Sequence, residues 1–216
     1  MSVIVTCAGP QGKWNNYLGV RSHFAPVGQQ REPLLHRTVR QLHETGEEIH
    51  ITCPPGFKSE YSVDGCETHE VEGSSEFDST RHLWDRSGRT LLMLGDVYFS
   101  DLALRKMFAL GAQRRYIAFG RYSASRVTGC KWGELFAHSF WPNQFDMLDH
   151  NLQIVSQAKN RGINRPTGWM LLRSIQGTPM GRHIVKQQWF HEINDWTDDI
   201  DFPDDYANHP ATRYNL

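Results

Sequence analysis

The sequence predicts an α/β protein in which helices cover a mostly parallel central sheet. Runs rich in β-branched residues at 2–9 and 47–56 flank a segment of helical periodicity at 31–46. The order strand, helix, strand is that of a right-handed crossover between parallel strands. A third apolar run at 90–94 continues the alternation, and such repetition favours a layered α/β architecture.

The first half of the chain predicts its elements in strict alternation. Pro33 near the start of the 31–46 segment and Gly46 at its end are typical helix boundaries. Serines precede a second predicted helix, 74–88, which ends at a glycine. Ser100 as N-cap and Gly111 as C-cap delimit a third predicted helix, and 114–121 predicts a further strand.

The second half is less regular, but it predicts elements of the same kinds. The segments 133–141 and 187–195 predict strands. Apolar residues at helical spacing predict helices at 144–162 and 168–177. A proline at an early position predicts a last helix at 202–209.

Composition predicts one domain spanning 1–216. The chain is 39% hydrophobic, which suffices for one large core. The 23 Lys and Arg balance the 24 Asp and Glu, so we expect no general affinity for nucleic acid or for an anionic membrane. No segment is typical of a membrane span or a secretory signal, which favours a cytoplasmic protein. The four cysteines form no CxxC pair, which argues against a zinc or redox motif.

A glycine-rich loop follows the first predicted strand. Gly9 and Gly12 would let backbone N–H groups approach phosphate oxygens, and Lys13 would add a positive charge. The loop matches neither the Walker pattern nor the dinucleotide fingerprint, so an ordinary turn remains an alternative.

Carboxylates occur at two places that a parallel sheet would bring together. Asp96 follows the apolar run 90–94, and ligands in such sheets collect at the carboxyl ends of strands. Asp199 and Asp201 precede the last predicted helix and are candidates for the same sheet edge. Magnesium commonly uses one or two protein carboxylates. The neighbouring Asp204 and Asp205 fit better as complements to the helix N-terminus.

Taken in order, these stretches resemble the sugar-nucleotide pyrophosphorylases and the molybdenum-cofactor-type nucleotidyltransferases. The loop at 8–13 is loosely similar to the family pattern AAGxGxR, and "RSHFAPVGQQREPLLHRTV" (21–39) to PKxLxPVxGxPLLxRTV, with extra residues before Pro33. "LLMLGDVYFSD" (91–101) resembles the family's metal strand, and "DIDFPDDY" (199–206) its closing xVDTPEDL. The resemblance implies a Rossmann-like three-layer sandwich with a GT-A-like fold.

The resemblance also implies roles for particular residues. Asp96 and Asp201 would hold Mg²⁺ (or Mn²⁺), with Asp199 as a further candidate ligand. The nucleotide would be bound by Ala8, Gly9, Pro10, Gln11, Gly12, Lys13 and Arg21. The middle of the chain lies where such enzymes place substrate loops, so the candidates for binding a sugar phosphate are Arg121, Arg126, Lys131 and Glu134, although such residues also fit a solvated loop. His82, His150 and His183 show no spacing typical of metal ligands.

The sequence therefore predicts a magnesium-dependent nucleotidyltransferase with Lys13, Asp96 and Asp201 as its catalytic residues. It would join a nucleoside triphosphate to a sugar 1-phosphate, or a similar phosphorylated small molecule, and release pyrophosphate. A phosphate nucleophile is already anionic, so no general base is required. One alternative is a GT-A glycosyltransferase, which the absence of a DxD at Asp96 disfavours. Another is a catalytically degenerate nucleotide-binding protein, because Ser22 stands where the family has a lysine.

Overall fold

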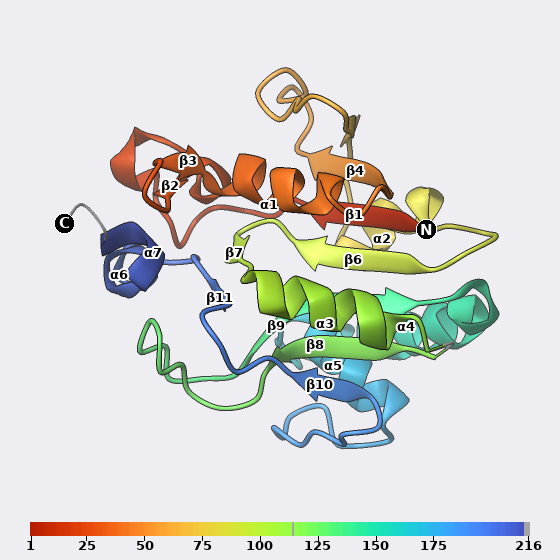
Figure 1. Cartoon of the computed structure of the whole chain (residues 1–216). Coiled ribbons are helices and arrows are strands. Elements are labelled where there is room, and N and C mark those ends of the chain that lie inside the picture. Colours follow the sequence, from red (N-terminus) through yellow and green to blue (C-terminus); the bar gives the residue numbers. More distant parts are fainter. Residues whose placement is uncertain (114, 214–216) are drawn as a thin grey trace.

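The computed structural model describes residues 1–113 and 115–213, and its main feature is a seven-stranded sheet (Figure 1). The strand order is β10-β8-β9-β6-β1-β4-β5. β9 runs antiparallel to both of its neighbours, and the other pairs are parallel. The bounds of the strands are β1 Ser2–Thr6, β4 Glu48–Cys53, β5 Glu67–Glu70, β6 Thr90–Leu94, β8 Ile117–Arg121, β9 Glu134–Phe140 and β10 Phe190–Glu192.

Helices cover both faces of this sheet (Figure 1). α1 (Leu34–His43) and α3 (Asp101–Gly111) pack on the face that carries Val3 and Val5 of β1. α2 (Glu76–Thr80), α4 (Phe145–Asn160) and α5 (Thr167–Ile175) pack on the face that carries Ile4. The central strands β1 and β6 carry apolar side chains on both faces because both of their faces are buried. Within residues 1–113 and 115–213, no helix has the length and apolarity needed to cross a bilayer.

The predicted fold class is confirmed, and each predicted helix and strand has a counterpart. The predicted helix 74–88 is shorter than expected, because α2 passes into a 3₁₀ turn at Arg81–Leu83. Asp85 then accepts hydrogen bonds from the backbone N–H groups of Ser87 and Gly88, which forms a turn instead of further helix. In the predicted strand 114–121, β8 begins at Ile117, and position 114 lies outside the described residues.

Several short elements were not predicted, and they gather at one end of the sheet. They are the hairpin of β2 (Pro26–Val27) and β3 (Glu32–Pro33), and the antiparallel pair of β7 (Val97–Tyr98) and β11 (Asp198–Asp199). α6 (Pro203–Asn208) and α7 (Pro210–Arg213) lie beside them. The arrowheads of β1, β4 and β6 point toward this end (Figure 1). Two-residue strands are too short to leave a periodic signal in a sequence.

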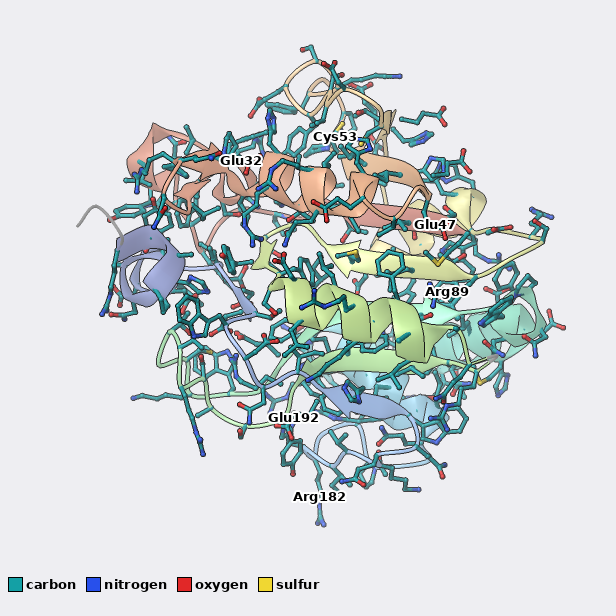
Figure 2. The ribbon with its side chains drawn as sticks, in the orientation of Figure 1. Glu32, Glu47, Cys53, Arg89, Arg182 and Glu192 are labelled. Atoms are coloured by element: carbon teal, nitrogen blue, oxygen red, sulfur yellow. The ribbon has the colours of Figure 1, made fainter. Side chains whose placement is uncertain are left out.

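Different contacts form at the two ends of the strands. Glu47 and Arg89 lie at the amino ends of β4 and β6, on the side away from β11 (Figure 2). There the N-terminal ammonium group forms an ion pair with Glu47 at 3.1 Å. At the carboxyl ends, Trp14 packs edge to face on Tyr206, with ring centroids 5.7 Å apart. The C-terminal segment is thereby held against the loop that follows β1.

Gly95 allows β6 to turn tightly at the carboxyl end of the sheet. Its N–H donates to the Thr6 carbonyl at 2.9 Å, and an added Cβ would lie 2.3 Å from the Cys7 Sγ. Gly95→Ala is therefore expected to lower the free energy of unfolding by about 2–4 kcal/mol. Gly181→Ala is the control, since nothing lies within 4 Å of its added Cβ. Equal urea midpoints for the two variants would contradict this account.

Candidate active site

An acidic centre forms where β6 ends beside β11. Asp96 follows Gly95 at the end of β6, and the Asp96 carbonyl accepts the Ile200 N–H at 2.8 Å. This bond and the pairing of β7 with β11 bring the side chain of Asp201 to that of Asp96, close enough to share a hydrogen bond. The two carboxylates that are distant in sequence thus meet at one sheet edge.

Two carboxyl groups in this centre, those of Asp96 and Asp199, have raised pKa values because they are buried beside other carboxylates. Burial and the charge of Asp201 raise the pKa of Asp96 to about 8. Burial and the neighbouring Glu134 carboxylate raise the pKa of Asp199 well above its ordinary value. Among the described residues, the buried Oδ1 of Asp199 has no hydrogen-bond partner. A buried carboxylate oxygen without a donor, within an all-oxygen set, fits a hard divalent cation such as Mg²⁺ or Mn²⁺.

Lys13 is the cation that reaches this centre from the loop after β1. Its ammonium group forms an ion pair with Asp201 and lies 5.1 Å from the centre of the Phe202 ring. Burial is the largest single influence on the pKa of Lys13 and lowers it, but the hydrogen bond to Asp201 and the charges of the neighbouring aspartates together outweigh burial, so the net shift is upward. The side chain is 57% exposed, so it remains accessible to a ligand.

The acidic centre lies between two adjacent cavities. The smaller, about 510 Å³, is lined by Asp96, by residues 8–11 of the loop after β1 and by part of segment 71–79. The larger, about 670 Å³, is lined by Lys13, Lys131, Glu134, Asp199 and Asp201 among others. Glu76 and Leu94 line both cavities. Two ligands could therefore meet at the carboxylates.

The loop after β1 is held in place by its own side chains. The Gln11 Oε1 accepts hydrogen bonds from the Ser22 N–H at 2.8 Å and from its hydroxyl at 2.9 Å. Ser22, which stands at the position of the family's lysine, is buried by this contact. Among the described residues, no acceptor takes the backbone N–H groups of positions 8, 9, 11, 12 and 13. These backbone N–H groups therefore have no partner within the described chain.

Some of the residues expected to bind ligand do not line either cavity. Arg21 stacks on the Phe57 ring, 4.1 Å from its centre, and forms an ion pair with Glu60 at 3.6 Å. Arg126 is exposed and lies outside both cavities. Gly12 does not line either cavity itself, although it belongs to the loop that does.

Arg121 is buried and holds other side chains in place. Its guanidinium donates to the Glu134 Oε2 at 2.7 Å and also forms an ion pair with Asp198. Asp198 accepts further hydrogen bonds from Ser125 and Thr128. Arg121 therefore does not face a substrate. It fixes Glu134, which lines the larger cavity.

Removing the Arg121 charge is expected to leave Asp198 as an unpaired buried carboxylate. Arg121→Gln should therefore lower the free energy of unfolding by about 3–5 kcal/mol. Arg126→Gln, at an exposed position in the loop that follows β8, should change it by less than about 0.5 kcal/mol. Guanidinium denaturation curves measure both values, and a wild-type midpoint for Arg121→Gln would refute the structural role.

The larger cavity also contains residues that the sequence did not indicate. Arg165 precedes α5, Glu76 begins α2 and His138 lies on β9. His183, for which no role was predicted, lines the same cavity. Acidic residues are common in the first turn of a helix, so the sequence gives no reason to assign Glu76 to a binding site.

Comparison with known proteins finds solved structures of similar fold. No protein-family model matches the sequence, and no curated protein matches it. A Bacillus anthracis protein provisionally assigned as a glucose-1-phosphate thymidylyltransferase is 15% identical, with a TM-score of 0.61 over 100% of this chain and 97% of its own. The bifunctional IspDF of Campylobacter jejuni is 15% identical, with a TM-score of 0.64 over 97% of this chain and 54% of its own, so this chain spans about half of that protein.

A third similar structure matches over almost its whole length. It is the 2-C-methyl-D-erythritol 4-phosphate cytidylyltransferase of Thermus thermophilus, 15% identical, with a TM-score of 0.53 over 95% of this chain and 94% of its own. At identities this low, the structural similarity shows the fold alone. The chain thus has the α/β fold of these sugar-phosphate-type nucleotidyltransferases.

Proposed function

We propose that the protein is a nucleotidyltransferase that joins a nucleoside triphosphate to a phosphorylated small molecule and releases pyrophosphate. A sugar 1-phosphate is the favoured second substrate. The observation that carries the proposal is the meeting of Asp96, Asp201 and Lys13 between two cavities. Each cavity has the volume of a small-molecule site.

The smaller cavity is suited to the nucleotide. In the described part of the chain, no Lys or Arg lines it, so the uncharged nucleoside fits there better than the phosphates do. The phosphates would extend toward the boundary, where the free N–H groups of the loop and Lys13 supply positive potential. With the nucleotide bound in this way, the α-phosphate would lie beside Asp96 and Asp201.

The larger cavity is suited to an anionic second substrate. Lys131 and Arg165 are exposed cations in its lining, and they have the charge needed to hold a phosphate group. Glu134 and Glu76 supply carboxylate acceptors for hydroxyl groups. Hydroxyls together with a phosphate are the recognition elements of a sugar phosphate.

The reaction requires charge stabilisation at the α-phosphate. A phosphate oxygen of the second substrate attacks the α-phosphorus, and the bond to the bridging oxygen of the pyrophosphate breaks. Lys13 and the loop N–H groups would stabilise the leaving pyrophosphate. Asp96, Asp199 and Asp201 would hold Mg²⁺ or Mn²⁺, which when bound neutralises charge on the reacting phosphates. No proton transfer is needed, and the ion pair with Arg121 holds Glu134 in its place in the larger cavity.

Product analysis tests this function. The protein is incubated with Mg²⁺, each nucleoside triphosphate and a panel of sugar 1-phosphates, and pyrophosphate is measured. We expect release only when both substrates are present. Release of a nucleoside diphosphate from a nucleotide-sugar, without pyrophosphate, would replace the proposal with glycosyl transfer.

A binding protein without turnover is the second candidate, and one observation favours it. The position of the family's lysine is the buried Ser22, and Arg21 turns away toward Glu60. For such a protein, nucleoside triphosphates with Mg²⁺ would raise the melting temperature while no substrate combination gave product.

A further inference from the structure

A second group of metal-ligating side chains lies at the edge of the sheet, on β4 and β5. His50 stands opposite Glu67 in the parallel register, and Thr52 stands opposite His69. Side chains two residues apart on a strand point to the same face. His50, Glu67 and His69 therefore share one face, and their ligand atoms all lie within 4.8 Å of one another.

The three ligand atoms form a compact triangle. The His50 Nδ1 lies 3.1 Å from the His69 Nε2. The Glu67 Oε2 lies 3.6 Å from the former and 3.7 Å from the latter. Tetrahedral Zn²⁺ with ligands at 2.0–2.1 Å holds its ligand atoms about 3.3–3.4 Å apart. The triangle therefore has nearly the dimensions of one face of a tetrahedral zinc site.

The surroundings favour ligation by neutral imidazole. The Glu48 Oε1 lies 3.5 Å from the His50 Nε2, the ring nitrogen that is not in the triangle. A carboxylate at this place orients a ligating imidazole and increases its basicity. Glu67 is 65% exposed on its side chain, so an ion can enter from solvent.

We propose that His50, Glu67 and His69 form a Zn²⁺ site that fastens the edge strand β5 to β4. Imidazole suits zinc and similar transition metals, whereas Mg²⁺ prefers oxygen, so this site differs in chemistry from the acidic centre. The fourth position is open to water or to His82, whose ring centre lies 6.1 Å from that of His69. Fastening β5 protects the exposed edge of the sheet. The proposal is independent of the nucleotidyltransferase function.

Zinc titration of the full-length protein tests the site. The protein is first treated with a chelator and then titrated with Zn²⁺ in excess Mg²⁺, because Mg²⁺ competes for carboxylate oxygens but not for imidazoles. We expect one equivalent of bound zinc and a rise in melting temperature. With Co²⁺ in place of zinc, we expect the visible bands of a nitrogen and oxygen site. A thiolate charge-transfer band would instead assign the metal to a cysteine and overturn the proposal.

Variants at the three positions make the test specific. His69→Gln is expected to weaken zinc binding by at least about 100-fold and Glu67→Gln by at least about 10-fold. Glu67 is exposed, so its variant folds even if a histidine variant does not. His150→Gln, at an exposed position on α4, is the control and should bind zinc as the wild type does. Wild-type zinc affinity in Glu67→Gln and His69→Gln, or no zinc uptake by the wild type, would overturn the proposal.

Discussion

Asp201→Asn is expected to lower the rate of pyrophosphate release by at least about 10³-fold. Asp201 shares a hydrogen bond with Asp96 and pairs with Lys13, so it lies where the metal and the phosphates would meet. Loss of a metal ligand removes several kcal/mol of stabilisation of the transition state, and about 1.4 kcal/mol corresponds to a tenfold change in rate. Steady-state kinetics with saturating triphosphate and Mg²⁺ measures the effect.

The matched control for this variant is Asp204→Asn. Asp204 is exposed in the first turn of α6, three residues from Asp201. Asp204→Asn therefore removes the same negative charge outside the site. It should retain activity within about twofold, since Asp204 is exposed and lines neither cavity. Near wild-type turnover in Asp201→Asn, with its melting temperature unchanged, would remove Asp201 from the mechanism.

Asp96→Asn is expected to stabilise the metal-free protein, and increasingly so as the pH rises. In the folded protein Asp96 keeps its proton up to about pH 8, whereas the ordinary aspartate pKa is 3.8. Between these values the folded state binds more protons than the unfolded state, so the wild-type free energy of unfolding falls as the pH rises. Asparagine does not titrate, so this loss is absent from the variant.

The size of this effect follows from the pKa difference. One pKa unit corresponds to about 1.4 kcal/mol, so the advantage of Asp96→Asn should grow by roughly 2–4 kcal/mol between pH 5 and pH 8. Urea denaturation in the presence of a chelator, at both pH values, measures it. A constant difference between the wild type and the variant would contradict the burial of Asp96 beside Asp201.

The fold was predictable because its main elements carry strong local signals. β1 and β6 are continuous apolar runs, and Ser100 at the start of α3 accepts a hydrogen bond from the Ala103 N–H as an N-cap does. β5 was not predicted, since "ETHE" is short and polar. Its place at the sheet edge explains this composition, because one side of the strand faces solvent.

The sites were predictable only where a residue follows a recognisable strand. Asp96 is found in this way, and the acidic segment supplies Asp201. Arg121 pairs with Asp198, which lies 77 residues later in the sequence, and no local pattern reveals such a pair. The pair of E-x-H patterns at 48–50 and 67–69 is a signal that strand alternation could have exposed. It becomes meaningful only once β4 and β5 are known to be neighbours.

The most direct test of the account is Mn²⁺ binding, measured by calorimetry, to the wild type, Asp96→Asn, Asp201→Asn and the double variant. If both carboxylates hold one ion, the wild type binds one equivalent in the presence of a nucleoside triphosphate. Each single variant should then lose nearly as much affinity as the double variant, because the effects of groups acting on one ion are not additive. Independent, additive losses, or wild-type Mn²⁺ affinity in either single variant, would show that Asp96 and Asp201 do not form one metal site.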